Sequence, residues 1–278
     1  MPDSYAEAPT KFIYAAGDRF AYRELGPRGG IPVVFFVHLA ANLDNWDPRI
    51  VDTIAQHRHV ITFDQRGVGA SSGTVPDTIE AAADDAHAFI TALGFETVDA
   101  FGLSMGGFIV QDLIVRHPTL VRKLVLAGTG PRGGRNIDKV ARVTYLDILR
   151  SVIAWADPKE FLFFERNKAG KQAAKDFMAR LKERKDGRDA TVPLSTMRTQ
   201  LKAITRYARS APSDLSVFTG PALIANGDRD RMVPSILSAD LHQRIKGSQL
   251  IIYSDAGHGS IFQYWEKFAP AAAGFLAD

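Results

Sequence analysis

Three residues whose types can together activate a nucleophile lie far apart in the chain: Ser104, Asp230 and His258. A serine hydroxyl is a poor nucleophile until a base takes its proton, and that base must be oriented by a third group. Ser104 is the middle residue of the stretch 102–106, Gly-Leu-Ser-Met-Gly, between a short apolar run and a helix-like run. This pattern predicts a tight strand-to-helix turn that holds the hydroxyl at the edge of a sheet.

The local backbone geometry explains why this stretch contains two glycines. The serine backbone is predicted to be strained, and side chains at Gly102 and Gly106 would collide with it. The N-terminus of the following helix would offer unpaired N–H groups and a partial positive charge where an oxyanion forms. A chain with 23 glycines can also produce the pattern by chance. The rest of the sequence must therefore show whether Ser104 is catalytic.

His258 is the candidate base. It lies in the stretch 255–259, Asp-Ala-Gly-His-Gly, directly after a predicted strand at 249–253. Flanking glycines would let the loop bring the imidazole ring toward Ser104. The histidines that lie in or beside predicted helices and loops are expected to be surface or capping residues: His57, His59, His87, His117 and His242.

Two carboxylates follow the predicted strand 222–227 and could orient the base. Asp228 lies nearer the strand end and could simply fix the turn by accepting backbone N–H groups. Asp230 lies deeper in the loop, four residues before Pro234, where a helix is predicted to start. We therefore favour Asp230 over Asp228 as the orienting acid.

The elements that must position these side chains alternate between strand and helix. Continuous apolar runs at 31–37, 60–64, 98–103 and 123–128 predict buried strands, and 11–16 and 20–25 predict a hairpin. Helices are predicted at 48–56 and 78–93, and later at 234–245 and 261–276, either side of the strand 249–253. The alternation predicts an α/β fold with a mostly parallel central sheet flanked by helices.

The alternation breaks between residues 131 and 212. This segment holds long helical stretches at 139–155, 158–167, 171–185 and 194–208, and no clear central strand. We predict an all-helical lid at 131–212, inserted in a core domain made of residues 1–130 and 213–278. The lid's many aromatic and aliphatic residues favour an apolar pocket over a sugar or phosphate site.

Composition excludes several classes of protein. The net charge is only +3 with both signs interspersed, and no nucleotide-binding or zinc motif occurs, so we expect no nucleic acid, cofactor or metal. The chain has no cysteine, which excludes disulfides and a thiolate nucleophile. The N-terminal sequence lacks the pattern of a secretory signal and no apolar run approaches a membrane span. We expect a cytoplasmic enzyme; the oligomeric state is left open.

Five motifs, in order, resemble those of the serine branch of the α/β-hydrolase fold superfamily along nearly the whole chain. They are the His38 loop, 64–71 (Asp-Gln-Arg-Gly-Val-Gly-Ala-Ser), 102–107, 227–230 and 257–258. The chain order Ser104, Asp230, His258 is also that of the superfamily. The second and third motifs are most similar to cofactor-free haloperoxidases, carboxylesterases and lactonases.

The resemblance implies an oxyanion hole made by the backbone N–H groups of Ala40 and Met105. The family usually has Gly after this histidine, whereas this chain has Leu39, whose side chain can shift the loop. Leu39 is the less favoured first donor. Ser104, in place of the aspartate of haloalkane dehalogenases and epoxide hydrolases, favours an acyl intermediate.

The sequence therefore predicts a serine hydrolase that cleaves a carboxylic ester or lactone of a small, largely apolar substrate through an acyl-enzyme. Two alternatives stay open on the same residues. One is cofactor-free perhydrolysis or haloperoxidation, in which the acyl-enzyme reacts with hydrogen peroxide. The other is a ligand-binding receptor that keeps the triad without turnover, since a fold does not fix a function.

Overall fold

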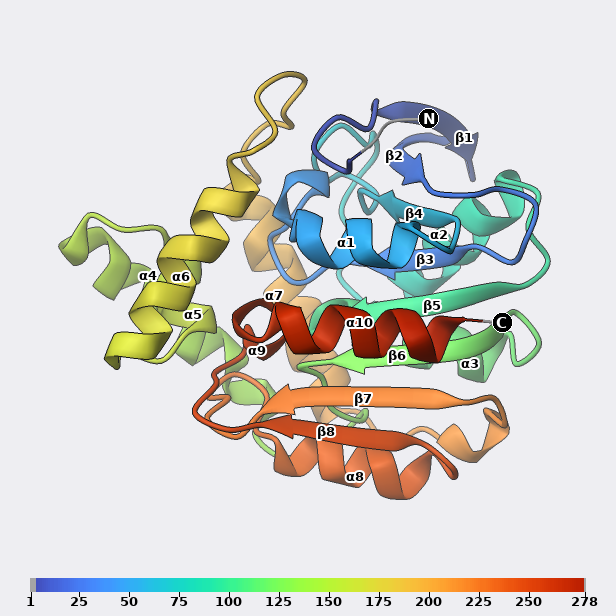
Figure 1. Cartoon of the computed structure of the whole chain (residues 1–278). Coiled ribbons are helices and arrows are strands. Elements are labelled where there is room, and N and C mark those ends of the chain that lie inside the picture. Colours follow the sequence, from blue (N-terminus) through green and yellow to red (C-terminus); the bar gives the residue numbers. More distant parts are fainter. Residues whose placement is uncertain (1–3, 278) are drawn as a thin grey trace.

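An eight-stranded sheet forms the centre of the computed structural model, which describes residues 4–277 (Figure 1). Its spatial order is β1-β2-β4-β3-β5-β6-β7-β8. Only the pairs β1–β2 and β2–β4 are antiparallel, which confirms the predicted mostly parallel sheet. The strands are β1 (Lys11–Ala15), β2 (Asp18–Leu25), β3 (Val33–Phe36), β4 (Val60–Phe63), β5 (Val98–Leu103), β6 (Val121–Ala127), β7 (Ala222–Gly227) and β8 (Gln249–Tyr253).

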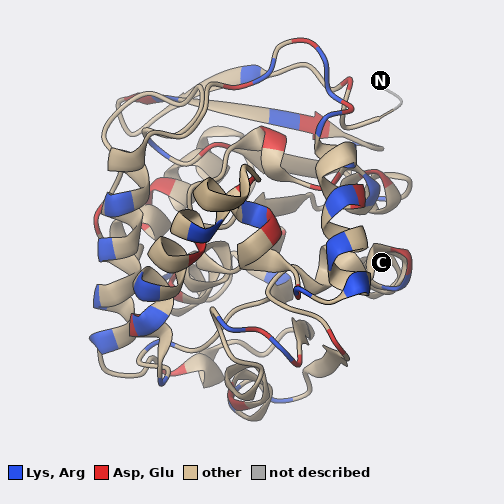
Figure 2. Cartoon of the chain, turned by 90° about the vertical axis from the view of Figure 1, so that its left-hand side faces the viewer, with Lys and Arg blue, Asp and Glu red and all other residues tan. Residues whose placement is uncertain are grey.

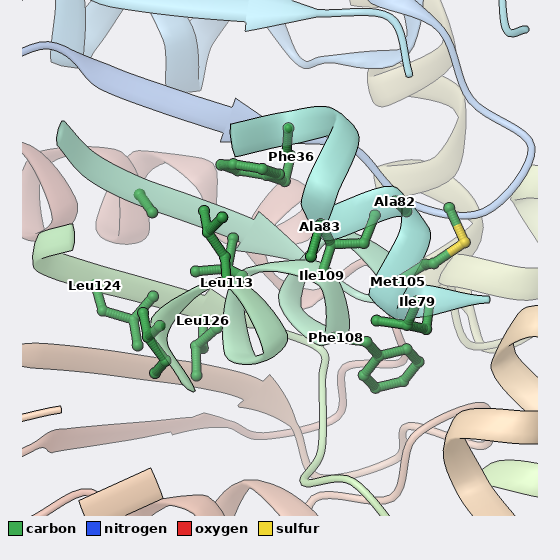
Figure 3. Packing of buried hydrophobic residues seen from close by; sticks show 14 of the residues in the cluster. Phe36, Ile79, Ala82, Ala83, Met105, Phe108, Ile109, Leu113, Leu124 and Leu126 are labelled. Carbon is green, nitrogen blue, oxygen red and sulfur yellow. The ribbon is translucent and has the colours of Figure 1, made fainter. Parts of the chain in front are cut away.

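The central strands are buried on both faces because helices cover the sheet from either side. Every residue of β3, β4, β5 and β7 is buried, which accounts for their continuous apolar runs. One face is covered by α1 (Pro48–Ala55) and α10 (Trp265–Leu276), and the other by α2 (Ile79–Ala92), α3 (Met105–Arg116) and α8 (Ile236–Arg244). Figure 3 shows buried side chains of α2 and α3 clustering with those of β3 and β6.

Between β6 and β7 the chain is helical. It forms α4 (Val140–Ala154), α5 (Pro158–Phe163), α6 (Lys168–Leu181) and α7 (Leu194–Arg209). In Figure 1, α4, α5 and α6 lie at the left, beyond the carboxyl ends of the strands, and α7 lies farther from the viewer. Short 3-10 helices are η1 (Leu43–Asn45), η2 (Ile137–Lys139) and η3 (Leu215–Val217). None of the helices within residues 4–277 is long and apolar enough to cross a membrane. Residues 1–3 belong to the N-terminal stretch that lacks the sequence pattern of a secretory signal, and they lie outside the described residues.

Three predicted helices differ from the structure by more than two residues at an end or are divided. The last one is divided at Tyr264 into α9 (Ser260–Gln263) and α10. Tyr264 leaves the helical conformation, stacks on Tyr253 at 5.0 Å and donates its hydroxyl to the carbonyl of Ser254. Helix α5 ends at Phe163, because Phe164 is extended and turns its buried ring inward. Helix α6 begins earlier than predicted, capped by the side chain of Asn167.

Candidate active site

Ser104 lies on the turn between β5 and α3, as the Gly-x-Ser-x-Gly pattern predicts. Its φ of 55° is in the left-handed region, a strained conformation for a non-glycine residue. The turn is fixed from both sides: the Ser104 N–H donates to the Ala127 carbonyl at 2.8 Å, and the Thr129 hydroxyl donates to the Ser104 carbonyl at 3.0 Å. These contacts leave the serine side chain directed toward His258.

The glycines of the turn are needed for a reason other than the one predicted. A Cβ at Gly106 would meet the carbonyl oxygen of Phe36 in β3, and a Cβ at Gly102 would lie 2.6 Å from the Cα of Gly107. The obstacle is therefore the close approach of helix α3 to the sheet, not the serine backbone. Both glycines let the N-terminus of α3 lie directly behind Ser104.

The structure brings Ser104, His258 and Asp230 together, from loops that follow β5, β8 and β7. His258 Nε2 lies 2.9 Å from Ser104 Oγ, and His258 Nδ1 lies 2.7 Å from Asp230 Oδ2. Since a carboxylate accepts from Nδ1–H, the Nε2 atom is left as the acceptor for the serine hydroxyl. All three side chains are buried.

The two candidate acids occupy different environments. The Oδ1 atom of Asp230 accepts the backbone N–H groups of Met232 and Val233 at 2.8 and 2.9 Å, which leaves Oδ2 directed at His258. Asp228 is exposed; its carboxylate accepts a long bond from the Ala256 N–H, at 3.4 Å, and lies 4.0 Å from Arg229 Nε. The geometry thus pairs Asp230 with the imidazole and leaves Asp228 on the surface turn.

The loop that carries His258 is pressed against Phe163 of helix α5. The Gly259 N–H donates to the Phe163 carbonyl at 2.8 Å, and a Cβ at Gly257 or Gly259 would lie 2.7 Å from a Phe163 atom. The Phe163 ring also lies 5.7 Å from that of His258 and 4.9 Å from that of His38. This role could not be predicted from the sequence, because Phe163 is one of several apolar residues in its helix.

The two predicted oxyanion donors differ in their partners. Met105 is the first residue of α3, where an α-helix provides no acceptor for the N–H group. Ala40 has a φ of 53°, and its N–H donates to the Oε1 atom of Gln200 in α7 at 2.8 Å. The Nε2 atom of Gln200 lies 3.4 Å from Gln65 Oε1. In this conformation the Ala40 N–H is therefore engaged by a side chain that the sequence analysis did not identify.

His38, on the same loop, is a neutral imidazole in the wall of the site. Its Nδ1 lies 2.9 Å from the Leu39 carbonyl, so Nδ1 carries the proton. Burial lowers the pKa of His38 to about 3, and the positive charge of Lys159 acts in the same direction. Its buried Nε2 atom has no hydrogen-bond partner among the described residues.

A cavity of about 240 Å³ opens over Ser104 and His258. A cavity of this size suits a small molecule. Side chains from the core and from helices α4, α5 and α7 line it, and most of them are apolar. The lining residues are His38, Leu39, Ala40, Ser104, Thr144, Ile148, Asp157, Pro158, Lys159, Leu162, Phe163, Thr191, Met197, Met232 and His258.

The glycine-rich loop at 64–71 lies outside the cavity lining and contacts neighbouring loops. Buried Asp64 accepts the backbone N–H groups of Leu43 and Ala70 at 2.8 and 3.0 Å, and burial raises the pKa of its carboxyl well above the usual range. Arg66 forms ion pairs with Asp18 and Asp85. These contacts tie loops together and do not face the cavity. No group of three or more residues that could hold a metal ion occurs within residues 4–277.

Fold and site together define a class of protein. A family model described as the alpha/beta hydrolase fold matches residues 31–263. The chain belongs to the α/β-hydrolase fold family, as the sequence motifs indicate. A solved alpha/beta hydrolase fold protein from Chitinophaga pinensis is 36% identical over 98% of both chains, with a TM-score of 0.92.

Relatives of known sequence carry several different activities in their names. A protein of Rhizobium rhizogenes, provisionally named carbamate hydrolase RutD, is 36% identical over 99 residues, and the match spans only 37% of its length. A provisionally named non-heme chloroperoxidase of Synechocystis is 26% identical over 92% of this chain and 94% of that protein. Enol-lactonase from Burkholderia xenovorans, 21% identical with a TM-score of 0.74, shares the fold.

Proposed function

We propose that this chain is a serine hydrolase that cleaves a carboxylic ester or lactone of a small, largely apolar substrate. The observation that carries the proposal is the continuous hydrogen-bonded series from Ser104 Oγ through both His258 nitrogens to Asp230. The apolar cavity of about 240 Å³ over the serine supports a small substrate.

In the proposed reaction, Ser104 Oγ bonds to the substrate carbonyl carbon while its proton passes to His258 Nε2. Asp230 stabilises the resulting imidazolium, and the N–H groups of Met105 and Ala40 bind the oxyanion. The bond from the carbonyl carbon to the leaving oxygen then breaks, and that oxygen takes the proton from His258. A water molecule, deprotonated by His258, cleaves the acyl-enzyme and regenerates Ser104.

Residues 131–212 are proposed to act as a lid domain over a core of residues 1–130 and 213–278. Cavity-lining residues of α4, α5 and α7, such as Thr144, Phe163 and Met197, support this division. A buried ion pair between Arg180 of α6 and Asp47, with donor–acceptor distances of 2.7 to 3.0 Å, would anchor one side of the lid to the core.

The test uses p-nitrophenyl butyrate and a serine-directed fluorophosphonate. Wild type should hydrolyse the ester and gain the mass of the phosphonyl group at Ser104, whereas Ser104→Ala should do neither. Full activity in Ser104→Ala would refute the assignment. Single turnover with a ligand-dependent rise in melting temperature would instead favour a receptor.

A second candidate is perhydrolysis, which the similarity to a provisionally named non-heme chloroperoxidase supports. Hydrogen peroxide would then replace water in cleaving the acyl-enzyme, with a peracid as the product. Adding peroxide, acetate and bromide to the pure protein and following bromination of a dye distinguishes the two. The peracid oxidises bromide to hypobromite, which brominates the dye, whereas ester hydrolysis forms no oxidant.

A further inference from the structure

One lysine lies in the wall that the helical segment contributes to the cavity, among apolar residues and the polar residues Thr144, Asp157 and Thr191. Lys159, in the first turn of α5, lines the cavity together with Ser104 and His258, and its side chain is 22% exposed. An ammonium group in an apolar wall requires a compensating charge. Its neighbour Asp157 provides that charge only in part.

The ion pair between Lys159 and Asp157 is long. The ammonium lies 3.4 Å from both carboxylate oxygens, whereas optimal charge-assisted bonds are about 2.7–2.9 Å. Asp157 is also the N-cap of α5, and its Oδ1 accepts the Lys159 backbone N–H at 2.9 Å. The carboxylate is therefore shared with the helix end, and the ammonium keeps the capacity for a shorter bond to a ligand.

A second polar group in the same wall has no partner. Thr144 of α4 lines the cavity and is 1% exposed, and its hydroxyl forms no hydrogen bond with any of residues 4–277. Burying a hydroxyl without a partner is unfavourable unless a ligand or water supplies one. Thr144 can donate to an oxygen of a ligand that reaches Lys159.

The surrounding surface is strongly cationic. Residues 131–212 contain 19 Lys and Arg but 9 Asp and Glu, whereas the rest of the chain contains 15 and 22. Figure 2, which faces this side of the molecule, shows Lys and Arg distributed over the helices nearest the viewer. A field of one sign above a cleft attracts small ligands of the opposite charge.

We propose that the substrate is an ester or lactone that carries a carboxylate on a substituent, and that Lys159 and Thr144 bind this carboxylate. The inference deepens the proposed hydrolase function and rests on it. Lys159 supplies the charge and Thr144 a hydrogen bond, while the apolar wall accommodates the carbon skeleton between the carboxylate and the scissile bond.

The experiment compares anionic and neutral esters of nearly equal shape. Mono-p-nitrophenyl adipate and its methyl ester place the charge on the acyl side, and 4-acetoxybenzoate and its methyl ester place it on the alcohol side. The readout is selectivity, the ratio of kcat/KM for the anionic ester to that for its neutral match. Lys159→Met should lower this ratio about tenfold in at least one pair, equivalent to about 1.4 kcal/mol, Lys159→Arg should keep most of it, and Thr144→Val should lower it less.

The matched control is Lys168→Met, which removes an exposed positive charge of the same segment outside the cavity. Its selectivity should equal that of wild type, because long-range attraction alone changes little with one charge. Equal selectivity in Lys159→Met and Lys168→Met for both pairs would overturn the proposal while leaving the hydrolase function intact.

A binding measurement decides the matter if wild type hydrolyses none of the four esters; the hydrolase function itself is tested separately, with p-nitrophenyl butyrate and the fluorophosphonate. Hexanoate binding is then measured by calorimetry. Affinity about tenfold weaker in Lys159→Met than in Lys168→Met supports the carboxylate site. Equal affinity in these two variants, or no binding to wild type, refutes it.

Discussion

The bond between Ala40 N–H and Gln200 makes a sharp prediction about the oxyanion hole. If Ala40 N–H is one of the two donors, it must leave Gln200 Oε1, 2.8 Å away, before it can bind an oxyanion. A neutral hydrogen bond contributes about 1 kcal/mol net. Replacing Gln200 with leucine removes the acceptor and should raise kcat about fivefold for p-nitrophenyl butyrate, since about 1.4 kcal/mol is tenfold in rate.

Gln200→Glu should change kcat in the opposite direction. A carboxylate holds the N–H with a charge-assisted bond about twice as strong, so kcat should fall about fivefold. Steady-state kcat and KM are measured for both variants, with Gln172→Leu, an exposed glutamine of α6, as the control.

A fall in kcat for Gln200→Leu would refute this reasoning. It would mean that Gln200 holds the 38–42 loop in its active conformation, and that the bond to Ala40 N–H is part of the working site. Unchanged kcat in both variants would equally contradict a role for Ala40 as a donor that Gln200 restrains. One oxyanion-hole donor contributes about 3 kcal/mol to the stabilisation of the transition state. A change in the availability of that donor therefore alters kcat by a measurable amount.

Three further outcomes are expected. Asp230→Asn should lower kcat about 10⁴-fold for p-nitrophenyl butyrate by disturbing the tautomer of the base, while exposed Asp228→Asn should leave it unchanged; equal effects would contradict the assigned acid. Gly106→Ala should destabilise the fold by about 3 kcal/mol in urea unfolding, because the new methyl group meets the backbone of the sheet. The control, Gly274→Ala, places its methyl group in open space on α10 and should stabilise the fold by about 0.5–1 kcal/mol. Burial raises the pKa of Asp52 to about 6, above that of an unfolded chain, so protonation of Asp52 favours the folded state. The free energy of unfolding of wild type should therefore fall relative to that of Asp52→Asn as the pH rises from about 4 to about 6. Urea unfolding at several pH values measures both, and parallel plots of stability against pH would contradict this.

The sequence was sufficient to predict the residues that the structure brings together around Ser104. Each lies just beyond a strand of a mostly parallel sheet, and carboxyl ends of such strands meet at one edge. Local pattern therefore determined the positions of Ser104, Asp230 and His258. Even the choice between Asp228 and Asp230 followed from distance along the loop, since a residue at the strand end is held in the turn.

Contacts from the helical segment could not be predicted in the same way. Gln200 reaches Ala40 across 160 positions of sequence, and nothing in its own helix distinguishes it from other polar residues. In the sequence, Phe163 does not differ from the other apolar residues of its helix. Only the structure shows that its carbonyl accepts a hydrogen bond from the Gly259 N–H. Such contacts depend on how α5 and α7 lie over the sheet, and helical periodicity fixes which face is buried but not its partner.

The two parts of the chain contribute different groups to the candidate site. The sheet edge supplies Ser104, Asp230 and His258, and these groups alone do not distinguish one ester from another. Selection must come from groups that differ in charge or shape near the carbonyl, and in the proposed site these are Lys159 and Thr144 of the helical segment, which line the cavity. Gln200 comes from the same insertion and also reaches the oxyanion loop. If the proposed roles of Lys159, Thr144 and Ala40 hold, a substrate that displaces these helices should change both recognition and the oxyanion hole.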